Sequence, residues 1–120
     1  MNLNLNQNLI LPFLLIAFFV FRYLRGRLIR NKVQLLLSEN PVIVDVRSEP
    51  EFRNGGNPHS INIPLPSISA DALKDIPRDR QLILCCASGM RSSMAMPLIK
   101  RLGYQKVLNA GSWTNTLKSS

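Results

Sequence analysis

Two adjacent cysteines, Cys85 and Cys86, stand at the end of an apolar run and are followed by small residues and an arginine. Residues 82–93 read Leu-Ile-Leu-Cys-Cys-Ala-Ser-Gly-Met-Arg-Ser-Ser, which predicts a buried strand, a tight loop and a helix that begins near Ser92. Backbone N–H groups in such a loop point inward above a helix N-terminus and form a cradle for an anion. They also favour a thiolate at the entry of the loop, and the thiolate is the nucleophilic form of cysteine.

The expected nucleophile is Cys86, because it stands where the strand enters the loop. Gly89 supplies a backbone conformation that a side chain would oppose, and Arg91 adds a positive charge at the mouth. The expected anion-binding residues are the rest of the loop and the first helical residues: Ala87, Ser88, Gly89, Met90, Arg91 and Ser92. Cys85 is expected to point the opposite way and to pack in the core, since side chains alternate along a strand.

The loop resembles the active-site loop of the rhodanese (sulfurtransferase) family, Cys-x-x-Gly-x-Arg followed by a small hydroxyl residue. Residues 44–52 are similar to the family's Asp-Val-Arg-x-x-x-Glu-aromatic signature, and residues 61–65 to its Ile-Asn-Ile-Pro strand. The resemblance spans roughly residues 33–120. It implies that Cys86 takes a sulfane sulfur from thiosulfate or a protein persulfide, holds it as a persulfide, and passes it to a thiol or cyanide acceptor.

The sequence departs from the family pattern before that second strand. The family commonly has Gly-His-Ile-Pro-Gly-Ala there, whereas residues 55–60 read Gly-Gly-Asn-Pro-His-Ser. No role is therefore assigned to His59, which is expected in a surface turn. His59 is the only histidine, and no Cys/His spacing typical of a metal site exists, so we expect neither a metal nor a cofactor.

Two alternative functions remain. Counted from Cys85, the loop also fits the Cys-x5-Arg-Ser pattern of tyrosine and dual-specificity phosphatases and arsenate reductases, although Ser88 and Leu84 replace the usual glycine and histidine. The second alternative is a catalytically silent rhodanese module that binds a partner. In any of these, Asp45 and Arg47 are expected to be structural, because a charged pair at a strand end must be satisfied by hydrogen bonds.

Alternation of strands with helical stretches predicts an α/β fold, a parallel sheet flanked by helices on both faces. Residues 42–46 are typical of a buried strand, and Ser48 with Glu51 predicts a capping box at the next helix. A weak helix is expected at residues 69–75, a last strand at 105–109 and a terminal helix to Ser120. The helix after the loop is expected to turn Met94, Leu98 and Leu102 toward the sheet and to end at Gly103, with Pro97 causing a kink or a late start.

The apolar pattern of the N-terminal residues predicts one transmembrane helix. Residues 9–21 are uninterruptedly apolar, no Lys or Arg precedes them, and no signal-peptidase site follows. We expect a membrane anchor at 1–24, a basic juxtamembrane linker at 25–32 and the rhodanese-like domain at 33–120.

Charge supports an orientation for this anchor. The chain carries a net charge of +8, of which five charges come from basic residues that follow the apolar run: Arg22, Arg25, Arg27, Arg30 and Lys32. The positive-inside rule then places the domain in the cytoplasm; an exported or periplasmic domain is the alternative. The domain lacks basic residues interleaved with aromatic ones, so nucleic acid is not an expected partner.

Overall fold

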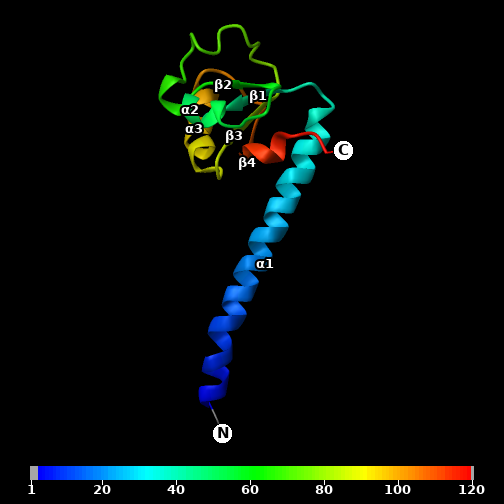
Figure 1. Ribbon diagram of the computed structural model, residues 1–120, viewed down its shortest axis with the longest axis vertical. Coiled ribbons are helices and arrows are strands. Elements are labelled where there is room, and N and C mark those ends of the chain that lie inside the picture. Colours follow the sequence, from blue (N-terminus) through cyan, green and yellow to red (C-terminus); the bar gives the residue numbers. More distant parts are fainter. Residues whose placement is uncertain (1–2, 120) are drawn as a thin grey trace.

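The computed structural model of the chain describes residues 3–119 and shows a small α/β domain at one end of a long helix (Figure 1). In chain order the elements are α1 (Leu3–Leu37), β1 (Val42–Asp45), α2 (Glu49–Arg53), β2 (Ser60–Asn62), η1 (Leu65–Ser67), β3 (Leu82–Cys86), α3 (Met90–Arg101), β4 (Val107–Ser112) and η2 (Trp113–Thr116). Residues 1, 2 and 120, at the outer ends of the predicted anchor and terminal helix, lie outside the described residues.

The sheet confirms the predicted α/β class. Its four strands are all parallel and lie in the order β2-β1-β3-β4, so β3 is central and its five residues are all buried. A strand buried on both faces is apolar throughout, as residues 82–86 are. The carboxyl ends of β1 and β3 meet at one edge, where Asp45 pairs with Cys85 in the register.

Helices cover both faces of the sheet and enclose two separate apolar cores. One core joins alternate sheet residues such as Leu84 and Cys86 to Ala95 and Ile99 of α3. The other joins Cys85 and its neighbours to Val33 at the end of α1 and to Trp113. The last turns of α1 are therefore part of the folded domain.

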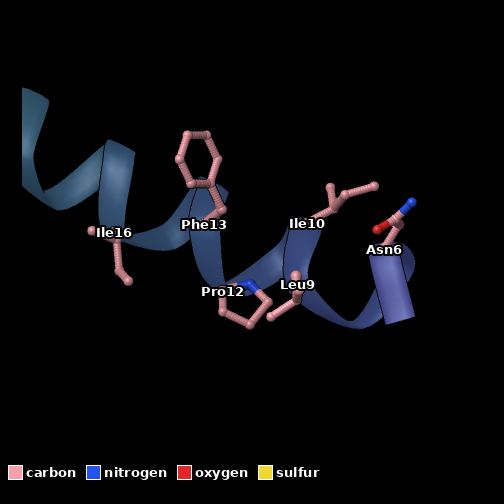
Figure 2. Close-up of a pocket in the computed structure, with 6 residues that line it drawn as sticks. All are labelled: Asn6, Leu9, Ile10, Pro12, Phe13 and Ile16. Atoms are coloured by element: carbon pink, nitrogen blue, oxygen red, sulfur yellow. The ribbon is translucent and has the colours of Figure 1, made fainter. Parts of the chain in front are cut away.

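Helix α1 runs without a break through the predicted linker at 25–32. Within its residues 6–37, an 18-residue stretch has a mean hydropathy of 1.8, so the helix is long and apolar enough for a membrane span, and a signal sequence would pass the same test. Figure 2 shows the part of this helix that carries residues 6–16, where Leu9 and Pro12 point to one side and Ile10 and Phe13 to another. These side chains surround a single helix and enclose no cavity, so the apolar surface of α1 is open.

The predicted packing face of α3 is confirmed at Leu102, which packs against the core, and is wrong at the other two residues. Met94 and Leu98 are exposed, and the helix instead buries Ser92, Ala95 and Ile99. Small side chains at the first two of these positions let the helix backbone approach the sheet, which the larger Met and Leu side chains would prevent. The late start expected from Pro97 is also wrong, because α3 begins at Met90 and continues to Arg101 with Pro97 inside it.

Smaller expectations had mixed outcomes. The capping box of Ser48 and Glu51 is present on α2, and Gly103 follows α3 with φ of 105°. Residues 69–75 form turns and no helix, held by the Ser69 hydroxyl, which accepts from the Ala72 N–H, and by burial of Leu73. The last strand extends to Ser112, beyond the predicted 109, and the terminal helix is one 3-10 turn, η2.

Candidate active site

The loop between β3 and α3 is shaped by two glycines on adjacent segments. Gly89 has φ of 102°, a left-handed conformation that an L side chain rarely adopts, and a Cβ there would stand 3.1 Å from Cα of Gly111. Gly111 belongs to a bulge in β4, where Ala110 and Gly111 lie between the paired positions Leu84–Asn109 and Cys86–Ser112. The bulge brings β4 against the loop, and bulges commonly re-aim residues beside active sites.

The thiol of Cys86 lies inside this loop and receives hydrogen bonds. The Gly89 N–H donates to Sγ at 2.9 Å, and the Ser92 hydroxyl donates to it at 3.2 Å. Burial raises the pKa of Cys86, but hydrogen bonds from the Ser92 hydroxyl and from the N–H groups of Ser88, Gly89 and Ser92 outweigh burial and hold it below its usual value. The geometry therefore stabilises a thiolate, and with it a nucleophile.

Cys85 faces the other core, as strand alternation predicts. It is completely buried with Ile43, Ile83 and the end of α1, and both cysteines are free thiols. Burial, reinforced by the Asp45 carboxylate, raises the pKa of Cys85 far above its usual value. Cys85 is therefore held as a neutral thiol away from the loop, where it packs as a small apolar side chain.

Arg91 reaches from α3 to α2 and is fully engaged there. Its two terminal nitrogens donate to the two carboxylate oxygens of Glu51 at 2.6 and 2.9 Å. The Arg91 guanidinium and the Ser48 hydroxyl hold the pKa of Glu51 at about 2. The predicted positive charge at the mouth of the loop is thus compensated by Glu51, which also caps α2.

Asp45 and Arg47 form a buried ion pair at the end of β1. The Arg47 backbone N–H and guanidinium both donate to the Asp45 carboxylate, with a shortest distance of 2.8 Å, and the guanidinium also donates to the Gly55 carbonyl at 2.7 Å. The guanidinium lies 5.0 Å from the ring centroid of Trp113. The hydrogen bonds to Asp45 raise the pKa of Arg47. The pair therefore joins the end of β1 to Gly55 and to Trp113, near the end of the domain.

Sequence reasoning missed Asn109, which fastens the loop. Its side-chain amide donates to the Gly89 carbonyl at 3.0 Å and to the Ser93 hydroxyl at 2.8 Å, and its oxygen accepts from the Gly111 N–H at 2.9 Å. An asparagine two residues before a glycine is a local turn signal that would have singled it out. The Arg91–Glu51 pair was missed as well, because its partners are 40 residues apart and no local pattern joins them.

The remaining loop residues lie on the surface. Ala87, Ser88 and Met90 are exposed, whereas the Cys86 side chain beneath them is buried. His59 is exposed in the turn before β2, as expected. Within residues 3–119 no cluster of three or more His, Cys, Asp or Glu side chains is arranged to hold a metal ion.

Comparison with known proteins identifies similar domains elsewhere. The rhodanese-like domain family matches residues 30–117. A sulfurtransferase from Allochromatium vinosum is 33% identical over 72 residues, covering 60% of this chain and 66% of that protein. The adenylyltransferase and sulfurtransferase uba4 of Ogataea parapolymorpha is 30% identical over 76 residues, which cover 63% of this chain and 20% of the yeast protein. The chain therefore spans about two thirds of the first relative and a fifth of the second.

A solved structure shows the same architecture. The human single-domain sulfurtransferase superposes with a TM-score of 0.59 at 26% identity, and the match covers 75% of this chain and 94% of the human one.

Proposed function

This chain belongs to the rhodanese-like domain family, and we propose that it is a membrane-anchored sulfurtransferase that carries sulfur as a persulfide on Cys86. The observation that carries the proposal is the position of the Cys86 thiol, which receives hydrogen bonds from the Gly89 N–H and the Ser92 hydroxyl. The named relatives described as sulfurtransferases support the reaction class.

In the proposed first step, the Cys86 thiolate attacks the outer sulfur of a donor such as thiosulfate. A bond forms between Sγ and that sulfur while the donor's sulfur–sulfur bond breaks, and sulfite leaves with the electron pair. Cys86 is left as a persulfide anion, whose charge the loop N–H groups stabilise in place of the thiolate. In the second step a thiol or cyanide attacks the outer sulfur, and the Cys86 thiolate is restored.

The two thiols are proposed to have different roles. A nucleophile needs thiolate character, which the loop supports at Cys86 and burial opposes at Cys85. This difference speaks against the phosphatase alternative, which requires Cys85 as the nucleophile. Arg91 is proposed to support the anion site mainly by fixing the loop against Glu51, since its charge is already paired.

We propose that α1 anchors the domain in a membrane. Its side chains at residues 9–21 are exposed although they are apolar, which is costly in water and favourable in a bilayer. The five basic residues after this run, which favour the cytoplasmic side, support a cytoplasmic domain. A reporter that is active only in the periplasm, fused after Ser120, should stay inactive; an active reporter would place the domain outside.

Intact mass spectrometry tests the reaction. The purified chain is incubated with thiosulfate, and the expected result is a gain of one sulfur atom that cyanide removes with release of thiocyanate. A chain that gains no sulfur from thiosulfate or from a low-molecular-weight persulfide would be a silent module, and the proposed function would be wrong.

A further inference from the structure

The direction of the strands fixes which side of the domain carries the Cys86 loop. α1 ends at Leu37, residues 38–41 turn the chain through Asn40 with φ of 53°, and β1 then packs against the end of the helix it has just left. In Figure 1 the domain lies beside the last turns of α1, and the loop that follows β3 faces the N-terminal part of α1. Since all four strands are parallel, their carboxyl ends, and the yellow β3–α3 loop, lie on that side of the domain (Figure 1).

Element lengths place the loop near the level where the apolar part of α1 ends. The helix continues for thirteen residues from 25 to 37, which is about 20 Å at 1.5 Å per residue. The five residues of β3 span about 16 Å, which is the most of this height that the strand can return. The remainder in that case, about 4 Å, is no larger than the polar layer of about 5–8 Å on each side of a bilayer's hydrocarbon core.

The domain is held firmly on α1, so this placement is maintained. Val33 is 0% exposed among Ile43, Ile83 and Cys85. Gln34 of α1 also holds the C-terminal segment. Its side-chain amide donates to the Leu117 carbonyl at 2.8 Å, and its side-chain oxygen accepts from the Ser119 N–H at 3.0 Å. A domain tied to a continuous helix by core packing and by these hydrogen bonds does not swing freely, unlike one on a flexible linker.

The loop presents an apolar side chain on this side. Met90 follows Gly89 directly and is 73% exposed, the largest exposed fraction among the methionines and leucines of α3. Methionine is flexible and polarisable, which suits an irregular apolar surface such as a lipid interface. The basic side chains of α1 at residues 22–32 are exposed too, and they match an anionic headgroup layer.

We propose that the face carrying the Cys86 loop rests on the anionic membrane surface that α1 enters, with Met90 in the lipid interface. This rests on the membrane anchoring in the proposed function. Cys86 then opens onto the headgroup layer, and its sulfur partners reach it along the membrane surface.

Tryptophan quenching by lipid tests this placement. The full chain is reconstituted in vesicles of phosphatidylcholine with phosphatidylglycerol, with and without bromine on the acyl chains near the headgroup. Three variants each add one tryptophan to the native Trp113: Met90→Trp in the loop, Asp71→Trp as the control, and Phe19→Trp in α1. Asp71 belongs to the connection between η1 and β3, and its side chain is 88% exposed. Figure 1 shows this connecting segment on the side of the domain away from the β3–α3 loop.

The added emission of Met90→Trp should fall about twofold in brominated vesicles, as expected for a side chain in the interface, while that of Asp71→Trp should not change. Equal quenching of these two variants, with strong quenching of Phe19→Trp, would overturn the proposed orientation and leave the anchor intact. An unquenched Phe19→Trp would overturn the anchor and the orientation together. Sulfur transfer, measured separately by mass, is independent of both results.

Discussion

Cys85 and Cys86 lie on opposite faces of β3, and the pKa values of their thiols are shifted in opposite directions. Cys86 turns into a loop whose N–H groups and Ser92 hydroxyl donate to its sulfur, and its pKa is lowered although burial alone would raise it. Cys85, one residue earlier, turns toward the end of α1 and the Asp45 carboxylate, and its pKa is raised. Both residues are almost completely buried, so burial does not distinguish them. What differs is the supply of hydrogen-bond donors, and for this reason we propose chemistry on the Cys86 face and a packing role on the Cys85 face.

The largest expected effect is on the Cys85 face. Asp45→Ala leaves the buried Arg47 guanidinium without its carboxylate, and loss of one partner of a buried pair typically lowers the free energy of unfolding by about 3–5 kcal/mol. Urea unfolding measures the loss, with Asp71→Ala at the exposed Lys74 pair as the control. The molecules that remain folded should still acquire sulfur from thiosulfate. If they do not, the Asp45–Arg47 pair takes part in the chemistry.

On the Cys86 face, Gly89→Ala should slow sulfur uptake. Its Cβ would meet Gly111 at 3.1 Å in a strained backbone conformation, so the Gly89 N–H would move away from Sγ. Loss of one hydrogen bond to a charged group, about 1.5–3 kcal/mol, corresponds to a rate of persulfide formation lower by about 10- to 100-fold. Gly26→Ala, which meets nothing within 4 Å, is the control. An unchanged rate in Gly89→Ala would mean that this N–H does not stabilise the reacting sulfur.

Ser92→Ala should shift the pH dependence of the reaction. Below the pKa of Cys86 the rate rises with pH as thiolate forms, and loss of the Ser92 hydroxyl raises that pKa. The half-maximal rate should therefore move to higher pH, with a rate near neutrality about tenfold lower. In Ser93→Ala the pH profile should stay in place, because the Ser93 hydroxyl contacts Asn109 and is not a donor to Cys86. Equal shifts in the two variants would remove the special role of Ser92.

The smallest expected effect concerns the link between α2 and the loop. Arg91 and Ser48 depress the pKa of Glu51 to about 2 from an ordinary 4.5, so Glu51 stabilises the fold above pH 4.5 and loses this contribution as pH falls toward 2. The melting temperatures of wild type and Glu51→Gln should therefore differ at neutral pH and converge across that window. Glu49→Gln, whose partner Arg53 is 3.9 Å away and exposed, should show little difference at any pH. A difference between wild type and Glu51→Gln that persists below pH 2 would have another cause.

The sequence predicted the opposite orientations of Cys85 and Cys86 better than it predicted the contacts that hold the loop in place. Strand alternation separates Cys85 from Cys86, and the glycine in the loop marks the left-handed turn, because both are consequences of local geometry. The Arg91–Glu51 and Asn109–Gly89 contacts join residues 40 and 20 positions apart, and no local periodicity reports them. The packing face predicted for α3 was wrong at two of its three residues for a related reason. The large side chains Met94 and Leu98 have helical spacing, but close approach to the sheet selects the small Ser92 and Ala95. Helix α1 continues through residues 25–32, because this basic stretch, which has the composition of a linker, is nevertheless a good helix former.

The most direct test of the central claim compares two single substitutions on this strand, Cys86→Ser and Cys85→Ser. Each purified chain is incubated with thiosulfate, and its mass and the sulfite released are measured together. The account predicts that Cys86→Ser gains no sulfur, while Cys85→Ser gains one sulfur atom at close to the wild-type rate. Sulfur uptake that survives in Cys86→Ser and is lost in Cys85→Ser would contradict the assignment of the two faces.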